Sequence, residues 1–256
     1  MADFNTMELM ICTAARELED GACVGVGTGA PCAAAMLAQK TKSPNLTIIF
    51  EAGGVAPLVP EMPISVGDSR TTWKACMASG MPDVMETGCR GMLDYTFLGG
   101  AEIDMYGNLN STRIGSDHQK PKVRFPGSGG ANDFASFAWR MMVMTPQDSK
   151  RFVERCTYVT TPGWINGGDS RAKCGLAVGA GPYKIITNMA VMDFEPDSKR
   201  MRIVALNHGF GLKDVEENCG FELIKAAKII ENPPPTEQEL AILREEVDPY
   251  RYVIGR

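Results

Sequence analysis

The chain has 256 residues, is 44% hydrophobic and 22% charged, and carries a formal net charge of −5 with a pI near 5.2. A chain of this length can bury a substantial core, and its acidic balance disfavours binding to nucleic-acid phosphates through bulk charge. Because the amino terminus lacks the apolar core of a signal peptide and no stretch approaches the roughly 20 apolar residues of a membrane span, we expect a cytoplasmic protein that binds neither nucleic acid nor membrane.

The first fifth of the chain alternates between helical and strand patterns. Apolar residues recur at helical spacing over residues 7–20, and Gly21 follows as a stop. An alternating strand begins at Ala22 and runs into a glycine turn, after which Pro31 opens a second helix. Residues 45–51 form the next strand. This helix-strand-helix-strand order is typical of an α/β fold with a parallel sheet.

The middle of the chain is rich in glycine, proline, serine and methionine over residues 52–92, which predicts long loops with short helices. Long loops within a compact domain are often functional. A strand at 95–98 and a turn at 106–108 follow. The densest glycine loop lies within 123–133 and opens a helix from Asp133.

The last part of the chain has plainer patterns. Apolar runs predict strands at 140–145 and 183–188, a hairpin at 190–206, and amphipathic helices at 211–220 and 236–247. Thr236 and Glu239 form a capping-box pattern at the start of the last helix. Because there is no internal repeat and no convincing domain boundary, we expect one domain over residues 1–256.

Three glycine-rich turns stand out, at residues 25–31, 51–57 and 127–133. In parallel α/β sheets, binding sites collect at the carboxyl ends of strands. Glycine lets a substrate approach the backbone closely and use its N–H groups. The three turns are therefore expected to build one pocket.

Several familiar kinds of site are disfavoured. Gly27 and Gly29 would need a third glycine at Cys32 to form a dinucleotide-binding fingerprint, and no P-loop pattern is present. The eight cysteines contain no C-x-x-C pair and no neighbouring histidine, so we expect reduced thiols and no metal site. His118 and His208 have no motif that ties them to a nucleophile, which favours polar loop and turn roles.

Glu51 is the strongest catalytic candidate, because it ends an apolar strand and precedes Ala52, Gly53 and Gly54. One interpretation is structural: the carboxylate caps a helix or pairs with Arg70. The other is a nucleophile, since the glycines leave no bulk before it and nearby N–H groups can receive a developing oxyanion. The residues alone leave both interpretations open.

Taken in order, the turns resemble a known family. The runs VGVGTGAP, IIFEAGG, GGAEIDMYGNLN, FPGSGGAND and YVTTPGWINGG, with DSKRM, VEENCGFEL and LREEVDP further on, are similar to β subunits of class I coenzyme A transferases, especially the glutaconate type. The resemblance covers nearly the whole chain. It implies a single three-layer α/β domain around a largely parallel sheet, and a homologous α subunit in an αβ unit that is often doubled or quadrupled.

The resemblance also implies a mechanism. Glu51 falls at the position of the family's catalytic glutamate, which attacks an acyl-CoA thioester and becomes a glutamyl-CoA thioester before an incoming acid takes over the CoA. Coenzyme A is then a co-substrate, and no metal or redox cofactor is needed. The residues Gly129, Gly130 and Ala131 are implied to stabilise the oxyanion. Pocket-lining roles fall on Gly27, Thr28 and Gly29, and on the two glycines after Glu51.

The chain departs from the wider family at the nucleophile. Many members carry Ser-Glu-Asn-Gly, whereas residues 50–53 read Phe-Glu-Ala-Gly, so the amide that can position substrate is missing and acyl specificity is open. A CoA-thioester hydrolase, carbon–carbon lyase or decarboxylase on the same fold is the alternative function, and a non-catalytic partner subunit is a third. Arg70 and Arg124 are possible clamps for a distal carboxylate, or structural ion-pair partners.

Overall fold

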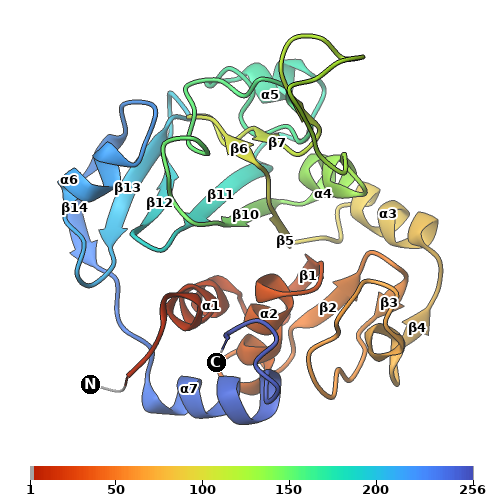
Figure 1. The fold of residues 1–256 in the computed structure, drawn as a ribbon. Helices are drawn as coiled ribbons and strands as arrows, with labels where there is room; N and C mark the ends of the chain where they lie inside the picture. Colours follow the sequence, from red (N-terminus) through yellow and green to blue (C-terminus); the bar gives the residue numbers. More distant parts are fainter. Residues whose placement is uncertain (1–2, 256) are drawn as a thin grey trace. The chain divides into compact units, whose positions relative to one another are not determined.

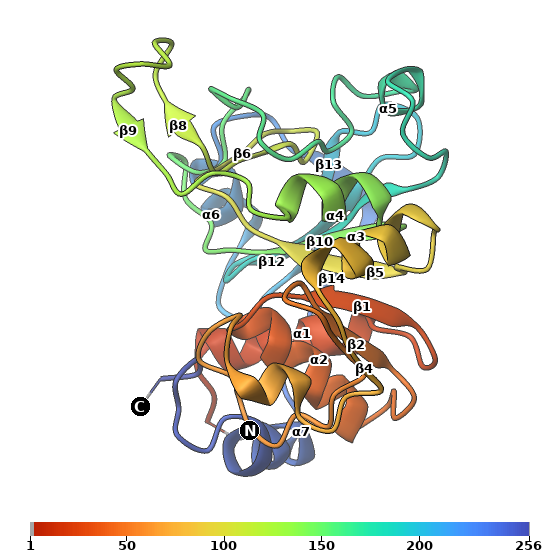
Figure 2. The same ribbon diagram turned by 90° about the vertical axis from the view of Figure 1, so that its right-hand side faces the viewer.

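In a computed structural model, residues 3–255 are described, and they form two compact units (Figures 1 and 2). The first unit comprises residues 1–97 and 233–256, and the second comprises residues 98–232. Helices and β-sheet occur in both units, which confirms the expected α/β class. The single domain expected over residues 1–256 stays a prediction.

The first unit contains segments from both ends of the chain. Its helices and strands, in chain order, are α1 (Thr6–Glu17), β1 (Cys23–Val26), α2 (Ala30–Lys40), β2 (Thr47–Phe50), β3 (Gly54–Val55), η1 (Ser69–Thr72), β4 (Met77–Ala78), α3 (Met81–Cys89), β5 (Tyr95–Leu98), α7 (Glu237–Ile242) and η2 (Leu243–Val247). β5 ends at the first residue of the second unit.

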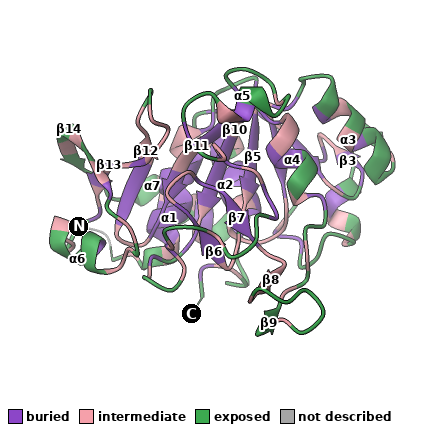
Figure 3. Ribbon diagram, turned by 90° about the horizontal axis from the view of Figure 1, so that it is seen from above, coloured by how far each residue is buried: buried purple, intermediate pink, exposed green. Residues whose placement is uncertain are grey.

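The strands of the first unit follow the order β5-β1-β2-β3-β4. β1 pairs in parallel with both β2 and β5, whereas β2, β3 and β4 pair antiparallel. The connection from β1 to β2 passes through α2, whose residues Cys32–Ala38 are all buried (Figure 3). Four alanines in this stretch give the helix a narrow profile, which suits close packing on β1. A buried strand-helix-strand unit therefore carries the start of the chain.

The carboxyl-terminal helices return to the first helix (Figure 1). Arg16 on α1 contacts Glu239 on α7 at 2.5 Å, and Glu8 contacts Arg244 on η2 at 2.6 Å. The side chain of Glu8 is only 2% exposed. Burial raises the pKa of Glu8, but the hydrogen bonds from Arg244 and Asn5 outweigh it and hold the pKa below its ordinary value. These contacts hold the two ends of the chain together.

The second unit contains the remaining elements: β6 (Glu102–Ile103), β7 (Leu109–Asn110), β8 (Arg113–Ile114), β9 (Val123–Arg124), α4 (Ala131–Phe137), β10 (Arg140–Met144), α5 (Ser170–Lys173), β11 (Gly181–Ile186), β12 (Ala190–Phe194), β13 (Met201–Leu206), α6 (Leu212–Glu217) and β14 (Ile224–Glu231). Its main strands follow the order β14-β13-β12-β11-β10. The outer pairs β10–β11 and β13–β14 are parallel, and the inner pairs are antiparallel. Buried residues of β10 to β13, with others from β6, β7, α4 and α6, form its core.

Most predicted elements are confirmed with small shifts at their ends. The strand at 95–98, the hairpin of β12 and β13, and the turn at 106–108 between β6 and β7 occur as expected. The helix predicted from Asp133 begins two residues earlier, at Ala131. α1 ends at Glu17 rather than Asp20, because Leu18 is already extended. β14 was not predicted.

Candidate functional site

Glu51 lies in a tight turn at the carboxyl end of β2. Ile48, Ile49 and Phe50 are at most 2% exposed, so the strand that carries Glu51 is fixed in the interior. The N–H of Gly53 donates to the carbonyl of Phe50 at 2.9 Å, which places Glu51 and Ala52 at the two corners of the turn. The Glu51 side chain is half-buried. A rigid strand end therefore presents this carboxylate.

The two glycines after this turn pack against a later part of the chain. A Cβ at Gly53 would lie 1.9 Å from the carbonyl oxygen of Ser79, and one at Gly54 would lie 1.8 Å from that of Thr71. Gly53 also has a φ of +123°, which L-residues rarely adopt. Both glycines are buried. Backbone thus fills the space beside them, and the glycines allow the segment 71–79 to pack against the turn that holds Glu51.

The first glycine turn lies beside Glu51. The parallel register pairs Val26 with Phe50, so Gly27 and Glu51 leave adjacent strands at the same level. A Cβ at Gly27 or Gly29 would meet no atom within 4 Å. Gly29 also needs its positive φ of +87° to start α2, where its carbonyl accepts from the N–H of Ala33 at 3.0 Å. In contrast to the glycines after Glu51, Gly27 and Gly29 have open space beside them at the carboxyl end of β1.

The third glycine turn belongs to the second unit. Its backbone is fastened to Ser111, whose carbonyl accepts from the N–H of Gly127 and whose hydroxyl donates to the carbonyl of Gly127, each at 2.9 Å. Gly129 has a positive φ of +51°. The N–H of Ala131 donates to the carbonyl of Ser128 at 2.9 Å, so it must leave that bond before it can reach a ligand. The loop ends at Gly130, the N-cap of α4.

The sequence-predicted site residues therefore fall into two groups. Glu51, the turn at 27–29 and the two glycines that follow Glu51 all lie around the ends of β1 and β2 in the first unit. The loop at 129–131 lies in the second unit.

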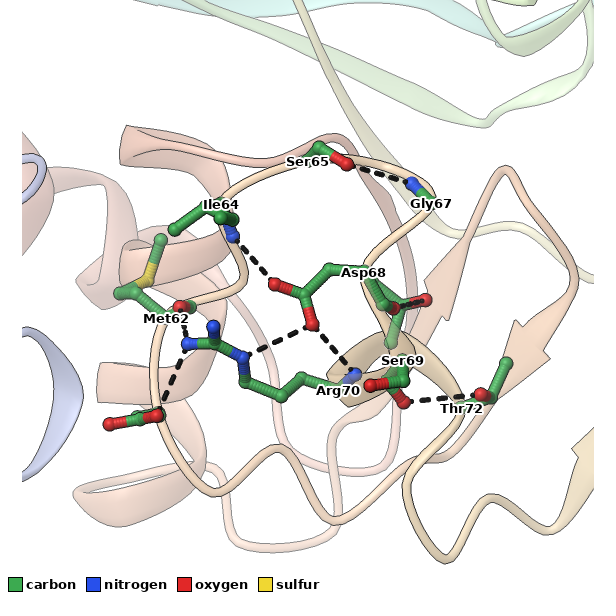
Figure 4. A network of polar contacts seen from close by, with 10 residues as sticks. Met62, Ile64, Ser65, Gly67, Asp68, Ser69, Arg70 and Thr72 are labelled. Atoms are coloured by element: carbon green, nitrogen blue, oxygen red, sulfur yellow. Dashed lines mark hydrogen bonds and ion pairs between the residues drawn. The ribbon is translucent and has the colours of Figure 1, made fainter.

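Arg70, a residue of η1, is engaged in a polar network (Figure 4). Its Nε donates to Asp68 at 3.1 Å, and its Nη1 donates to Glu61 at 3.2 Å and to the carbonyl of Met62 at 2.8 Å. Asp68 also accepts from the N–H of Ile64 at 3.1 Å. Backbone hydrogen bonds, the one from Arg70 foremost, hold the pKa of Asp68 below its ordinary value. The structural interpretation of Arg70 as an ion-pair partner is thereby supported.

The network around Asp68 also supports the turn that holds Glu51, and this was not predicted from the sequence. The carbonyl of Asp68 accepts from both the N–H and the hydroxyl of Thr71, at 3.0 and 2.7 Å. Thr71 is 2% exposed, and its own carbonyl faces Gly54. Asp68 therefore fixes the segment that packs behind the Glu51 turn. An available signal was the pattern Asp-Ser-Arg-Thr, since aspartate commonly caps a short helix.

The other residues considered from the sequence lie in surface positions. His118 accepts through its carbonyl from Arg124 at 2.8 Å, in the hairpin of β8 and β9, and both residues are exposed. His208 contacts Glu231 at 3.1 Å in an exposed pair. Within residues 3–255, no group of three or more potential ligands could hold a metal ion. In the same stretch, no helix has both the length and the apolar character needed to span a bilayer.

Comparison with known proteins adds strong similarities. The profile of the Coenzyme A transferase family matches residues 7–218. The chain is 37% identical to the B subunit of 3-oxoadipate CoA-transferase from Pseudomonas knackmussii, over 95% of this chain and 94% of that protein. It is 36% identical to the B subunit of glutaconate CoA-transferase from Acidaminococcus fermentans, over 97% and 96% of the two chains. The solved glutaconate coenzyme A-transferase of that organism matches 99% of this chain and 98% of its own, with a TM-score of 0.94 at 34% identity.

Proposed function

Because the chain belongs to the coenzyme A transferase family, we propose that it is the B-type subunit of a two-subunit CoA-transferase in which Glu51 is the nucleophile. The observation that carries the proposal is the position of Glu51. It lies at the corner of a tight turn on a buried strand end, level with the open turn at Gly27. An acyl group can approach a carboxylate in this position from the open side.

The proposed reaction has two halves. In the first, a carboxylate oxygen of Glu51 attacks the thioester carbon of the acyl-CoA, and the C–S bond breaks to give a mixed anhydride and CoA thiolate. The thiolate then attacks the Glu51 carbonyl, which releases the first acid as a carboxylate and leaves a glutamyl-CoA thioester. In the second half, an incoming carboxylate runs the same two steps in reverse and leaves as the new acyl-CoA.

A carboxylate is a weak nucleophile in water, so the enzyme must hold it oriented and partly dehydrated. The half-buried position of Glu51 on a hydrogen-bonded turn supports this role. Gly27, Thr28 and Gly29 are proposed to line the approach to it, because added side-chain atoms at either glycine would enter open space. The backbone N–H groups of the loop at 129–131 are proposed to bind the oxyanion, and that of Ala131 must first leave Ser128.

We further propose a small dicarboxylic acid as one acyl partner. Two relatives that match nearly the whole chain are named for glutaconate and 3-oxoadipate, which are both dicarboxylates. Arg70 does not support this choice, because its guanidinium is engaged by Asp68 and Glu61. The residue that binds the distal carboxylate is therefore proposed to come from elsewhere in the assembly, including a homologous partner subunit.

The experiment is steady-state kinetics of the chain co-expressed with its partner subunit, with an acyl-CoA donor and glutaconate as acceptor. Glu51→Asp withdraws the carboxylate by one methylene and should lower kcat by roughly a hundredfold or more, because attack requires near-contact geometry. Glu51→Gln should abolish transfer. Glu86→Asp, an exposed glutamate on α3, is the matched control and should retain activity.

Retained transfer in Glu51→Gln would remove Glu51 from the mechanism. Thioester hydrolysis that proceeds without an acceptor acid would favour the hydrolase or lyase alternative. The intact glutamate and the 36–37% identity to transferase subunits over nearly the full length support transfer instead.

A further inference from the structure

The second unit contains a cavity of about 300 Å³ beside α5 that the proposed reaction does not use. Its walls include Trp164, Arg171, Ala172, Ala177, Val178 and Lys199, and we call it the Trp164 cavity. The two alanines, the valine and the indole ring make most of this wall apolar. Its volume is at the lower end of the range of small-molecule sites in proteins.

Arg171 brings a buried positive charge to this cavity. Its side chain is 2% exposed, and its Nη atoms donate to the carbonyls of Ala135, Pro162 and Gly163 at 2.5 to 3.0 Å. Within residues 3–255, no described contact of this guanidinium involves a carboxylate. Burial lowers the pKa of Arg171 to about 10. A buried charge without a counter-ion is costly, so an anion in the cavity would stabilise this arginine.

Two further features of the residues around the cavity favour an anionic ligand. Arg171 Nε and Trp164 Nε1 are both buried and have no hydrogen-bond partner, whereas buried N–H donors are usually paired. Lys199 adds a second cation, with its Nζ 4.8 Å from the centroid of the Trp164 ring. Asp169 also lines the cavity, but its carboxylate pairs with Lys173 at 2.8 Å. The cavity therefore has an excess of positive charge.

Packing and hydrogen bonds hold the Trp164 side of the wall in place. The Trp164 ring packs on Gly181, where an added Cβ would lie 2.8 Å from the ring. The N–H of Trp164 donates to the carbonyl of Tyr106 at 2.8 Å, and the hydroxyl of Ser170 donates to the carbonyl of Trp164 at 2.9 Å. The N–H of Gly168 donates to the carbonyl of Ser198 at 3.2 Å, which fastens the loop next to Lys199. A preformed site loses little entropy on binding.

We propose that the Trp164 cavity binds a small organic carboxylate with an apolar body. The apolar body packs against the indole ring, Ala177 and Val178. The carboxylate faces Lys199 and neutralises the buried charge of Arg171. This assignment uses only residues of the second unit and does not depend on the role of Glu51.

Calorimetry of the full chain, alone and with its partner subunit, tests the proposal with benzoate as the probe and benzamide as its neutral counterpart. We expect benzoate to bind at least about tenfold more tightly than benzamide, because only benzoate supplies the missing charge. Ala177→Leu extends an exposed wall residue into the cavity and should abolish benzoate binding. Lys199→Gln should weaken binding by about two- to fivefold, the effect of one partly exposed charge.

Lys213→Gln is the matched control, because Lys213 is an exposed lysine on α6 that does not line the cavity. Its affinity for benzoate should equal that of the wild type. The proposal is overturned if benzoate does not bind, if benzamide binds as tightly, or if Ala177→Leu leaves binding unchanged. Transfer kinetics of Ala177→Leu then identify the natural ligand. A raised KM for the acceptor acid means that the ligand is a substrate, and an unchanged KM means a separate carboxylate.

Discussion

Gly54→Ala should disable the enzyme while leaving it folded, because the added methyl group has no room. Its Cβ would lie 1.8 Å from the carbonyl oxygen of Thr71, whereas real Cβ contacts are essentially never closer than 3.0 Å. Gly54 and the carbonyl group of Thr71 must therefore separate by more than about 1 Å in a closely packed region. Thr71 is held by two hydrogen bonds to Asp68, so the turn that carries Glu51 takes up much of the shift.

A displacement of about 1 Å at a reacting group costs roughly a hundredfold in rate, which corresponds to about 2.7 kcal/mol of activation free energy. Overpacking should also lower the free energy of unfolding by about 1–3 kcal/mol. The assay compares kcat and Tm of the co-expressed complex between the wild type and Gly54→Ala. The kcat is measured at a temperature well below the Tm of both. We expect kcat to fall by about a hundredfold in the folded variant.

Gly67→Ala provides the control in the preceding loop, four residues before Thr71, because the atom nearest its added Cβ would be the hydroxyl of Ser65 at 3.9 Å. It should retain both kcat and Tm. Wild-type kcat in Gly54→Ala, or an equal loss in Gly67→Ala, would refute the view that packing behind the turn positions Glu51.

Two further predictions concern stability and thiol chemistry. Glu8→Gln should lower Tm at neutral pH. The native pKa of Glu8 lies below its ordinary value of 4.5. The difference in Tm between wild type and variant should therefore be present above about pH 4.5 and vanish as the pH falls through the native pKa. Thermal melts between pH 3 and 7 measure it, and a constant difference would contradict the assignment. In the native chain, iodoacetamide should label the exposed thiols of Cys76, Cys89 and Cys174 before the buried Cys12 and Cys32, since burial raises the pKa of each of the latter to about 12. Peptide mass spectrometry over time gives the order, and early labelling of Cys32 would refute it.

The position of Glu51 could be predicted from local sequence. An apolar run that ends on a carboxylate and then two glycines defines a buried strand and a sharp turn, and the structure has both. What the glycines pack against could not be predicted in the same way. Thr71 and Ser79 approach Gly54 and Gly53 from positions 17 and 26 residues further along the chain, and no local pattern indicates that contact.

Two other features could not be predicted from local sequence patterns. β14 was not predicted because Lys225 and Lys228 interrupt its apolar pattern. The strand can accommodate these lysines because it is an edge strand and is largely exposed. Arg171 is the opposite case, because an arginine in a short polar stretch is expected at the surface and is instead 2% exposed. Its burial depends on carbonyl groups from residues 135, 162 and 163, which only the folded chain brings together.

The most direct test of the central claim is mass spectrometry of the co-expressed complex after incubation with an acyl-CoA and no acceptor acid. We expect a CoA adduct on the peptide that contains Glu51, and its loss when glutaconate or another acceptor acid is added. The adduct should be absent from Glu51→Gln. Turnover of the acyl-CoA without any adduct on this peptide would contradict covalent transfer through Glu51.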